Sequence, residues 1–538
     1  MTFRLKLTNQ VYLGTVSVII IIGGLLRILN LQQRTFFGYD LALINIFAYK
    51  FIVLHEKIVT GHFIGGVLAT FPPTFYYIAT ILLKITNYSY YILPLSTIAL
   101  NILTLIIIAV FLPKLFGKLA TLITIFLYSV SAIVVYYTLV GTNPEYIPPL
   151  LVISIIGTVF YLKDRRIWWL PIVAFSLALA THFHATIFFA IPGVVLAFII
   201  YRKQIRLDKP GIIAIAISLL ILVVVGFVPH YLENKYMGNR NISYIIKALT
   251  QGMEGPNISK QDSIANFLES TIQTNGELLI PSPEIYLHPN PPISQSTTLP
   301  PIKILGIAMS LFLLFVLIKN LLFLNKGPCG KTIVTTIFIV YFILQAIIPK
   351  YEASPWMKPL QWLDAVYFPL YFILLGAELS ELIQTIRQRR PRVLIASAIT
   401  TIVILLVFNI QKWVENTNRT EIPKLQTMIA ISRTVEAESK WDHNPFIYSG
   451  KGGAVWVWNF NFILWKETGD TKYLRQFIWA DAKPFRNEPI YIVSGDFSNL
   501  NYLLAGQEDY AKGFQDRPII KKLGKVHGYF VEKVYNQI

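Results

Sequence analysis

Long apolar runs alternate with short polar loops over the first 410 residues of the chain. Each run is close to the roughly 17–25 apolar residues that a helix needs to cross a lipid bilayer. The pattern predicts about eleven spans. They fall at 11–29, 93–113, 119–138, 147–162, 168–180, a run that ends before 201, 211–229, 303–324, 332–348, 363–383 and 393–410.

Two of the intervening loops are long, at 30–92 and 230–302. In the first, INIFAYKFIVL is typical of an amphipathic helix that lies in the membrane interface. The later stretch FPPTFYYIATILLKI predicts a short or re-entrant helix that its prolines begin. The second loop is too long to be a simple connection between two spans.

The last part of the chain, 411–538, has a different pattern: it is polar, punctuated by glycine, and contains strand-like pieces such as PIYIVSG and HGYFVEKVY. We expect a small α/β domain here. The aromatic stretch IYSGKGGAVWVWNFNFILW suits the core of such a domain, or a sugar-binding surface. The predicted fold is therefore mainly α, a polytopic membrane helical bundle over 1–410 followed by this C-terminal domain.

Composition and charge support a membrane protein. Of 538 residues, 54% are hydrophobic and only 14% charged, and the mean hydropathy is +0.55. The net charge of +18 comes from basic clusters in alternate loops, which marks the cytoplasmic side of a plasma-membrane protein rather than a nucleic-acid partner. This places the N-terminus in the cytoplasm and the C-terminal domain outside. The single cysteine, Cys329, excludes an intrachain disulfide and a cysteine metal cluster.

The polar residues that could act in catalysis or binding gather on the predicted outer side. Asp40 lies in FFGYDLA, shortly after the first span, and an acid near membrane depth indicates a functional site. It could instead cap the following helix. Glu145 follows an Asn-Pro turn in GTNPEYIPP and could bind a cation or a sugar hydroxyl, although the turn alone explains the motif.

Histidines and lysines supply the remaining candidates. His182 and His184, in THFHAT, could ligate a metal or, when protonated, meet a phosphate; the alternative is ordinary interfacial hydrogen bonding. Lys350 and Lys358 lie among tryptophans and prolines in IIPKYEASPWMKPLQW and could neutralise a lipid-linked phosphate. The chain contains no Walker A, GxSxG or HExxH motif, which disfavours an ATP-driven pump, a serine hydrolase and a zinc protease.

The order of these pieces resembles the GT-C glycosyltransferases, the superfamily of protein mannosyltransferases, aminoarabinose transferases and their RgtA/B/C/D-like bacterial relatives. The matching pieces are FFGYDLA, FPPTFYYIATILLKI, NPEYIPPLLVISI, LALATHFHATIFFAIPGVV and WLDAVYFPLYFILLGAELSEL, across roughly residues 10–390. Many members have Glu directly after the first acid, where this chain has Leu41. Many also have Arg-Tyr in the late span, where this chain has Asp364-Ala-Val-Tyr.

The resemblance implies inverting transfer of a sugar from a polyprenyl-phosphate donor to a lipid, glycan or protein hydroxyl on the outer face. Asp40 would be the general base, and cationic groups among His182, His184, Lys350 and Lys358 would stabilise the departing phosphate. A divalent cation stays an open expectation. Two alternatives stay open as well: a flippase or transporter of lipid-linked oligosaccharide, and a ligase or polymerase of surface polysaccharide built on the loop 230–302.

Overall fold

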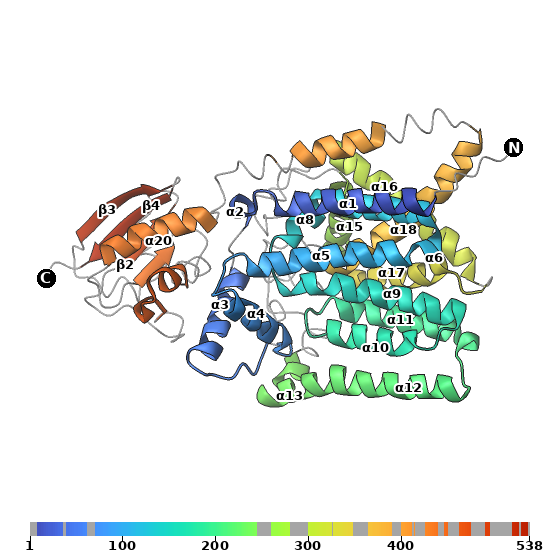
Figure 1. Ribbon diagram of the computed structural model, residues 1–538, viewed down its shortest axis with the longest axis horizontal. Helices are drawn as coiled ribbons and strands as arrows, with labels where there is room; N and C mark the ends of the chain where they lie inside the picture. Colours follow the sequence, from blue (N-terminus) through green and yellow to red (C-terminus); the bar gives the residue numbers. More distant parts are fainter. Residues whose placement is uncertain are drawn as a thin grey trace. The chain divides into compact units, whose positions relative to one another are not determined.

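The computed structural model is mostly helical (Figure 1). It describes residues 8–35, 39–61, 70–244, 260–279, 300–324, 327–347, 364–389, 400–411, 414, 425–439, 446–449, 462–474, 490–494, 519–526 and 529–535. Clustering of contacts divides the chain into two compact units, here called unit 1 and unit 2. Unit 1 comprises Met1–Leu29, Val59–Phe75 and Leu95–Asn416, and unit 2 comprises Asn30–Ile58, Tyr76–Pro94 and Thr417–Ile538.

The helices up to the middle of the chain follow the apolar runs. They are α1 (Asn9–Ile28), α2 (Leu31–Arg34), α3 (Tyr39–Ile52), α4 (Thr74–Ile85), α5 (Ile92–Phe111), α6 (Pro113–Phe116), α7 (Lys118–Val130), α8 (Ala132–Thr138), the 3-10 helix η1 (Asn143–Tyr146), α9 (Ile147–Asp164), α10 (Trp169–Ala180), α11 (Ile187–Ile200), the 3-10 helix η2 (Arg202–Gln204), α12 (Lys209–Ile221), the π-helix η3 (Leu222–Phe227) and α13 (Val228–Tyr236).

The later helices are α15 (Lys260–Glu277), α16 (Pro300–Leu322), α17 (Gly330–Ile347), α18 (Asp364–Arg389), α20 (Leu425–Ser439) and the 3-10 helix η7 (Thr471–Leu474). Among the described residues, six helices are long and apolar enough to cross a membrane, and α7 with α8 forms a seventh candidate that bends by 62°. Four further predicted spans appear as shorter apolar helices: α10, α11, α17 and 400–411. The mainly α membrane fold is confirmed, and the count of eleven spans stays a prediction.

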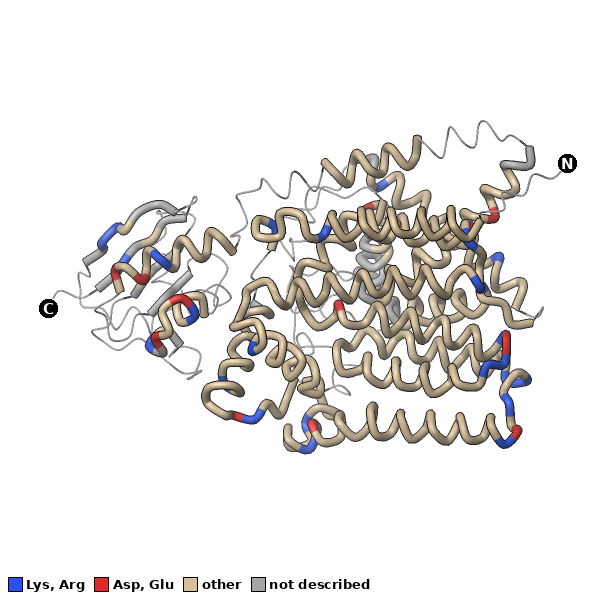
Figure 2. The backbone as a smooth tube through the Cα atoms, viewed as in Figure 1, with Lys and Arg blue, Asp and Glu red and all other residues tan. Residues whose placement is uncertain are grey.

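Unit 1 is a bundle in which α9 packs on α10, α10 on α12, α11 on α17, and α7 on both α1 and α18. Small residues allow the closest approaches: a Cβ on Gly376 of α18 would collide with the Thr124 side chain of α7. The long helices carry few charged residues along their length, and the charges gather near helix ends (Figure 2). A hydrogen bond from Arg165 Nε to Gln204 Oε1 at 3.1 Å brings two of the basic loops together.

Part of the predicted outer loop 230–302 is instead a helix packed within unit 1. Helix α15 lies against α16, where a Cβ on Gly306 would collide with the Ile272 carbonyl. The α15 side chain Asn275 donates to Ser310 Oγ at 2.9 Å and accepts from Tyr367 Oη at 2.7 Å. These bonds satisfy the amide of a polar helix inside the bundle, which an apolar-run criterion cannot detect.

Unit 2 joins most of the first predicted loop to the C-terminal part of the chain. Its four-stranded sheet has the order β1-β2-β4-β3. The strands are β1 (Phe446–Ser449), β2 (Ile490–Ser494), β3 (Ile519–Val526) and β4 (Tyr529–Tyr535); β1 and β2 are parallel, and β4 is antiparallel to both its neighbours. The strands predicted in PIYIVSG and HGYFVEKVY are confirmed as β2 and β4. The boundary at 411 and the outer location stay predictions.

Candidate functional site

The stretch TFPPTF, 70–75, is the centre of a polar and aromatic cluster in unit 1. Its last two residues, Thr74 and Phe75, begin helix α4. The helix starts here because Pro72 and Pro73, just before it, have no backbone N–H to continue a helix in the N-terminal direction. Thr70 N–H donates to Asn241 Oδ1 at 3.2 Å. On the other side, the Phe75 ring meets the Tyr146 ring edge-on, with centroids 5.2 Å apart. The stretch therefore links α13's C-terminal side to η1.

His182 connects three segments of this cluster. Its Nδ1 lies 2.7 Å from Thr74 Oγ1, and its Nε2 lies 2.7 Å from the Val225 carbonyl oxygen in η3. Because a carbonyl only accepts, Nε2 carries the hydrogen, and in the neutral ring Nδ1 accepts from the Thr74 hydroxyl. Burial lowers the pKa of His182, which is 4% exposed. Both ring nitrogens of this neutral imidazole are engaged within the protein.

Two further histidines near this point, His184 and His230, are less buried than His182 and have other partners. His230 Nε2 lies 3.0 Å from Thr181 Oγ1, and its ring stands edge-on to His182 with centroids 5.5 Å apart. The predicted site residue His184 is half-buried; its Nδ1 lies 3.2 Å from Thr186 Oγ1, and its ring lies near Phe71. The structure thus brings His182 and His184 to the same stretch, 70–75, through different partners.

Glu145 lies in η1, whose neighbours hold it from both sides. Asn143 donates from its amide to the Phe183 carbonyl, and Tyr146 stacks on the Phe183 ring with centroids 5.2 Å apart. The Tyr146 and Ser96 hydroxyls are 2.8 Å apart. Glu145 itself is 8% exposed. The Asn-Pro turn therefore does more than reverse the chain, since it fixes an acid in the interior of unit 1.

A buried arginine that the sequence analysis missed stands near this acid. Arg27, in the last turn of α1, is fully buried, and its Nη1 donates to the Gly23 and Ser129 carbonyls at 2.8 Å each. Its Nε and Nη2 make no hydrogen bond to any described residue. Arg27, Glu145 and Tyr128 interact electrostatically. The sequence did contain a signal for this residue, because an arginine near the end of the apolar run IIIIGGLLRILN is a charge at membrane depth.

We call Arg27, Asn101, Tyr128 and Glu145 the Arg27–Glu145 cluster. Asn101 Nδ2 donates to Tyr128 Oη at 3.2 Å, while its Oδ1 has no hydrogen-bond partner among the described residues. The described side chains of Arg27 and Glu145 make no direct ion pair within 4.0 Å. The two opposite charges therefore lie near one another in a low-dielectric interior, but they form no direct ion pair.

A second acid, Glu233, was also missed. It belongs to α13, is 2% exposed and lies near Thr70 and Asn241, but neither of its carboxylate oxygens has a hydrogen-bond partner among the described residues. An apolar cavity of about 560 Å³ lies between α10, α11 and the α12–η3 segment. The residues that line it include Leu177, Val194, Leu222 and His230. This apolar lining suits a hydrocarbon chain more than a polar ligand.

The remaining predicted site residues are placed only in part. Asp40 is the second residue of α3, in unit 2, and its side chain is not among those described. Lys350 and Lys358 lie outside the described residues. Within the part of the chain that is described, no three His, Cys, Asp or Glu side chains form a group able to hold a metal ion. A divalent cation therefore stays an open expectation.

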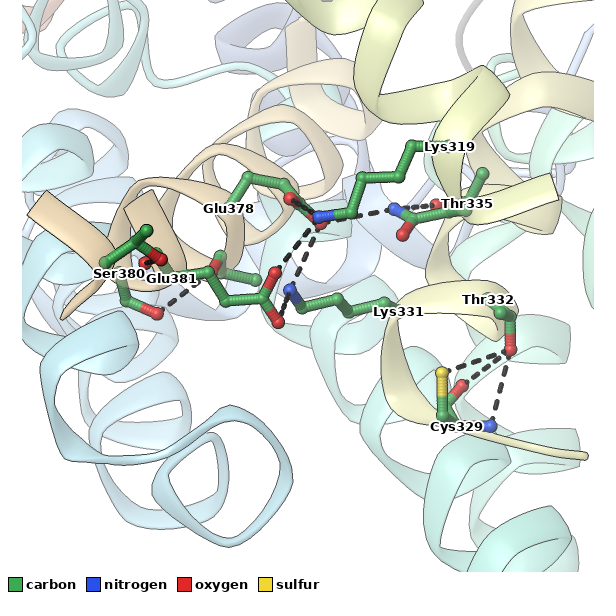
Figure 3. A network of polar contacts seen from close by, with 11 residues as sticks. Lys319, Cys329, Lys331, Thr332, Thr335, Glu378, Ser380 and Glu381 are labelled. Carbon is green, nitrogen blue, oxygen red and sulfur yellow. Dashed lines mark hydrogen bonds and ion pairs between the residues drawn. The ribbon is translucent and has the colours of Figure 1, made fainter. Parts of the chain in front are cut away.

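A different kind of polar site joins α16, α17 and α18. Figure 3 shows two lysines and two glutamates, here called the lysine–glutamate network. Lys319 Nζ lies 2.6 Å from Glu378 Oε2 and 3.0 Å from Glu381 Oε2. Lys331 pairs with the same two acids, at 3.2 Å from Glu378 Oε1. Every charge in this network has an opposite charge in contact.

Comparisons with known proteins agree with this architecture. The sequence profile of the family described as dolichyl-phosphate-mannose-protein mannosyltransferase matches residues 70–229. That range contains the stretch 70–75, Glu145 and both predicted site histidines, and it ends one residue before His230. No curated protein matches the chain by sequence.

Solved structures extend the likeness to nearly the whole chain. ArnT from Cupriavidus metallidurans bound to undecaprenyl phosphate is similar with a TM-score of 0.59 and 10% identity, over 97% of this chain and 98% of that chain. Its apo form gives 0.56 and 11% over the same shares. Archaeal oligosaccharyltransferase AglB from Archaeoglobus fulgidus, in complex with an inhibitory peptide and a dolichol-phosphate, gives 0.52 and 13%, over 94% and 72%.

The chain therefore has the GT-C fold, and its resemblance to the GT-C glycosyltransferases is confirmed at the level of the superfamily. Together the family profile and the apolar helices support an integral membrane protein of the glycosyltransferase class.

Proposed function

We propose that this protein is an inverting glycosyltransferase that moves a sugar from a polyprenyl-phosphate donor to an acceptor hydroxyl on the outer face of the membrane. Two similar folds support a lipid-phosphate donor, since one was solved with undecaprenyl phosphate and the other with a dolichol-phosphate. The apolar cavity beside His230 offers space for hydrocarbon within the bundle.

The position of Asp40 is the observation that carries the proposal. The first span, α1, ends at Ile28, the short helix α2 follows, and α3 begins at Tyr39 with Asp40 in its first turn. In the resemblance to the GT-C superfamily, an acid at this place is the catalytic base. An ionised carboxylate at a helix start is also favoured by the positive end of the helix dipole.

The chemistry of this step is a single displacement. Asp40 accepts the proton of the acceptor hydroxyl while its oxygen attacks the anomeric carbon. The bond from that carbon to the phosphate oxygen breaks, and polyprenyl phosphate departs with the bonding electron pair. Cationic groups at the phosphate lower the barrier; His184, Lys350 and Lys358 are candidates, and His182 is one only if it gives up an existing hydrogen bond.

The Arg27–Glu145 cluster serves substrate binding in this proposal. Glu145 keeps slight exposure, whereas Arg27 is fully buried. We assign to Glu145 the contact with a sugar hydroxyl or a cation, and to Arg27 the compensation of the glutamate charge in a low-dielectric interior.

Mass spectrometry of envelope glycans and glycolipids tests the proposal. A strain without this protein is complemented with wild type or with Asp40→Asn at matched expression. We expect one sugar mass to disappear in the deletion strain and to return with wild type only. Restoration by both versions would remove Asp40 from the mechanism, and lipid-linked precursor on the inner leaflet would favour a flippase instead.

A further inference from the structure

The C-terminal half of helix α3 is fixed by aromatic contacts within unit 2. Phe47 stacks on Tyr76 of α4 with ring centroids 4.6 Å apart, and Phe51 meets Tyr77 edge-on at 5.4 Å. Tyr77 in turn donates from its hydroxyl to the Ile58 carbonyl at 2.8 Å. One side of α3 therefore rests on α4.

The C-terminal part of the chain supplies a second support for α3. Trp465, in the helical segment 462–468, meets Tyr49 of α3 edge-on, with centroids 4.6 Å apart. The same indole meets Tyr88 edge-on at 5.2 Å. Tyr49 is 2% exposed. Each such aromatic pair contributes about 0.5–1.5 kcal/mol beyond the area it buries.

Neighbours of Trp465 bind the turn that follows α4. Tyr90 donates from its hydroxyl to Glu467 Oε1 at 2.9 Å, and Lys466 Nζ lies 3.4 Å from the Tyr90 ring centroid. The Phe462 ring meets Tyr90 edge-on at 6.2 Å. The segment 462–468 thus contacts α3 and the turn at 88–90 at the same time.

The turn itself has an unusual backbone. Asn87 and Tyr88 are both left-handed, with φ of 49° and 57°. Asparagine adopts this conformation readily, but a bulky aromatic residue does so only where its surroundings hold it. The Tyr88 ring meets the Trp465 indole, so the C-terminal segment supports this strained turn.

We infer that Trp465 is a positioning residue for Asp40, and that the C-terminal part of the chain takes part in catalysis by holding α3 in place. The inference rests on the proposed function. Tyr49 follows Asp40 by nine residues on one helix, about 13.5 Å along its axis. A hydrogen-bonded helix transmits a shift at Tyr49 to Asp40, and a displacement of about 1 Å at a catalytic group costs on the order of a hundredfold in rate.

The test compares Trp465→Ala with Trp465→Phe in reconstituted protein. We expect Trp465→Ala to lower kcat by about tenfold to a hundredfold while KM for the donor stays within about twofold, because the base moves and the donor site does not. Trp465→Phe keeps an aromatic ring on Tyr49 and should recover most of the rate. Trp168→Ala, with a tryptophan that is 61% exposed, is the matched control and should match wild type.

Hydrogen exchange and a double variant separate positioning from loss of folding. Amide exchange in 39–52 should rise in Trp465→Ala and return to the wild-type level in Trp465→Phe. In an Asp40→Asn background, Trp465→Ala should cause no further loss, since both act through one carboxylate.

The outcomes distinguish this inference from the proposed function. Normal transfer by Asp40→Asn overturns the proposed function. Loss of transfer in Asp40→Asn with an unchanged kcat in Trp465→Ala overturns the inference alone. A rise in KM without a change in kcat would also overturn it, because Trp465 would then act on binding.

Discussion

The Arg27–Glu145 cluster and the lysine–glutamate network are both charged sites inside unit 1, but they are built in opposite ways. In the network, two lysines meet two glutamates in direct contact (Figure 3). Asn320 Nδ2 also donates to Glu378 Oε1 at 3.4 Å. In the cluster, the arginine keeps two nitrogens without a described partner, and the glutamate stands apart from it.

This difference indicates which of the two sites has hydrogen-bonding groups left to bind a ligand. In the lysine–glutamate network every charge is already paired with an opposite charge, so we assign it the role of holding helices α16, α17 and α18 together. An unsaturated buried charge costs free energy, and such sites persist where function requires them. Three substitutions in unit 1, each with a control, test whether a buried polar group serves stability or function.

Glu378→Gln should have the largest effect, and it should fall on stability. Glu378 is 5% exposed, and removing its charge leaves Lys319 and Lys331 less compensated. We expect a loss of about 3 kcal/mol in the free energy of unfolding. This is the lower end of the range for removing one partner of a buried ion pair, because Lys319 is 30% exposed. Thermal unfolding of the reconstituted protein measures it, with transfer per folded molecule unchanged.

Glu381→Gln is the matched control for Glu378→Gln. Its side chain is 53% exposed, so we expect a loss below about 1 kcal/mol. A drop in transfer without a drop in stability for Glu378→Gln would contradict the structural role of the network.

Arg27→Gln should reduce transfer by about tenfold to a hundredfold, equivalent to about 1.4–2.8 kcal/mol of barrier. The reason is that Glu145 loses its compensating charge, while the amide can still donate to one of the two carbonyls that Arg27 holds. Steady-state transfer kinetics measure the effect. Arg202→Gln, at an exposed site, is the control. Wild-type kinetics in Arg27→Gln would show that the cluster is structural.

Apart from the controls, His182→Gln should have the smallest effect, a loss of about 1–2 kcal/mol at pH 7 because the link between Thr74 and Val225 is removed. Burial lowers the pKa of His182 in the folded state, so below the ordinary value of about 6.5 the unfolded chain binds a proton that the folded chain does not. The His182 contribution to stability is therefore lost as pH falls below about 6.5.

Thermal unfolding at pH 7.5 and pH 5.5 checks the His182 prediction. The difference between the two values should be smaller in His182→Gln than in wild type. His55→Asn, at an exposed left-handed position where asparagine fits, should keep the wild-type difference. An identical pH dependence in His182→Gln and wild type would show that another group causes the loss.

Apolar runs were enough to predict most of the bundle, because a helix in lipid must satisfy its backbone internally and present apolar side chains outward. Helix α15 was missed because its amides and hydroxyls are paired by distant partners such as Tyr367, which no local pattern reveals. The strands β2 and β4 were visible as short alternating segments, but their pairing joins residues about 40 positions apart.

Some residues of the candidate site could be predicted from the sequence, but the way they lie relative to one another could not. His182 and Glu145 stood out by their position at span ends. Nothing local shows that Arg27 lies near Glu145, 118 residues later, or that Trp465 packs on Tyr49. Contacts of this length depend on how the helices close into the fold, so they follow from tertiary structure only.

The most direct test of the account is the rate of sugar transfer by purified, reconstituted protein supplied with the membrane lipid extract of the deletion strain as donor. Wild type should transfer the sugar and invert its anomeric configuration. Asp40→Asn, folded and with unchanged thermal unfolding, should be slower by about a hundredfold to ten-thousandfold, the range for loss of a general base. Equal rates for the two proteins, or retention of the configuration, would contradict the mechanism.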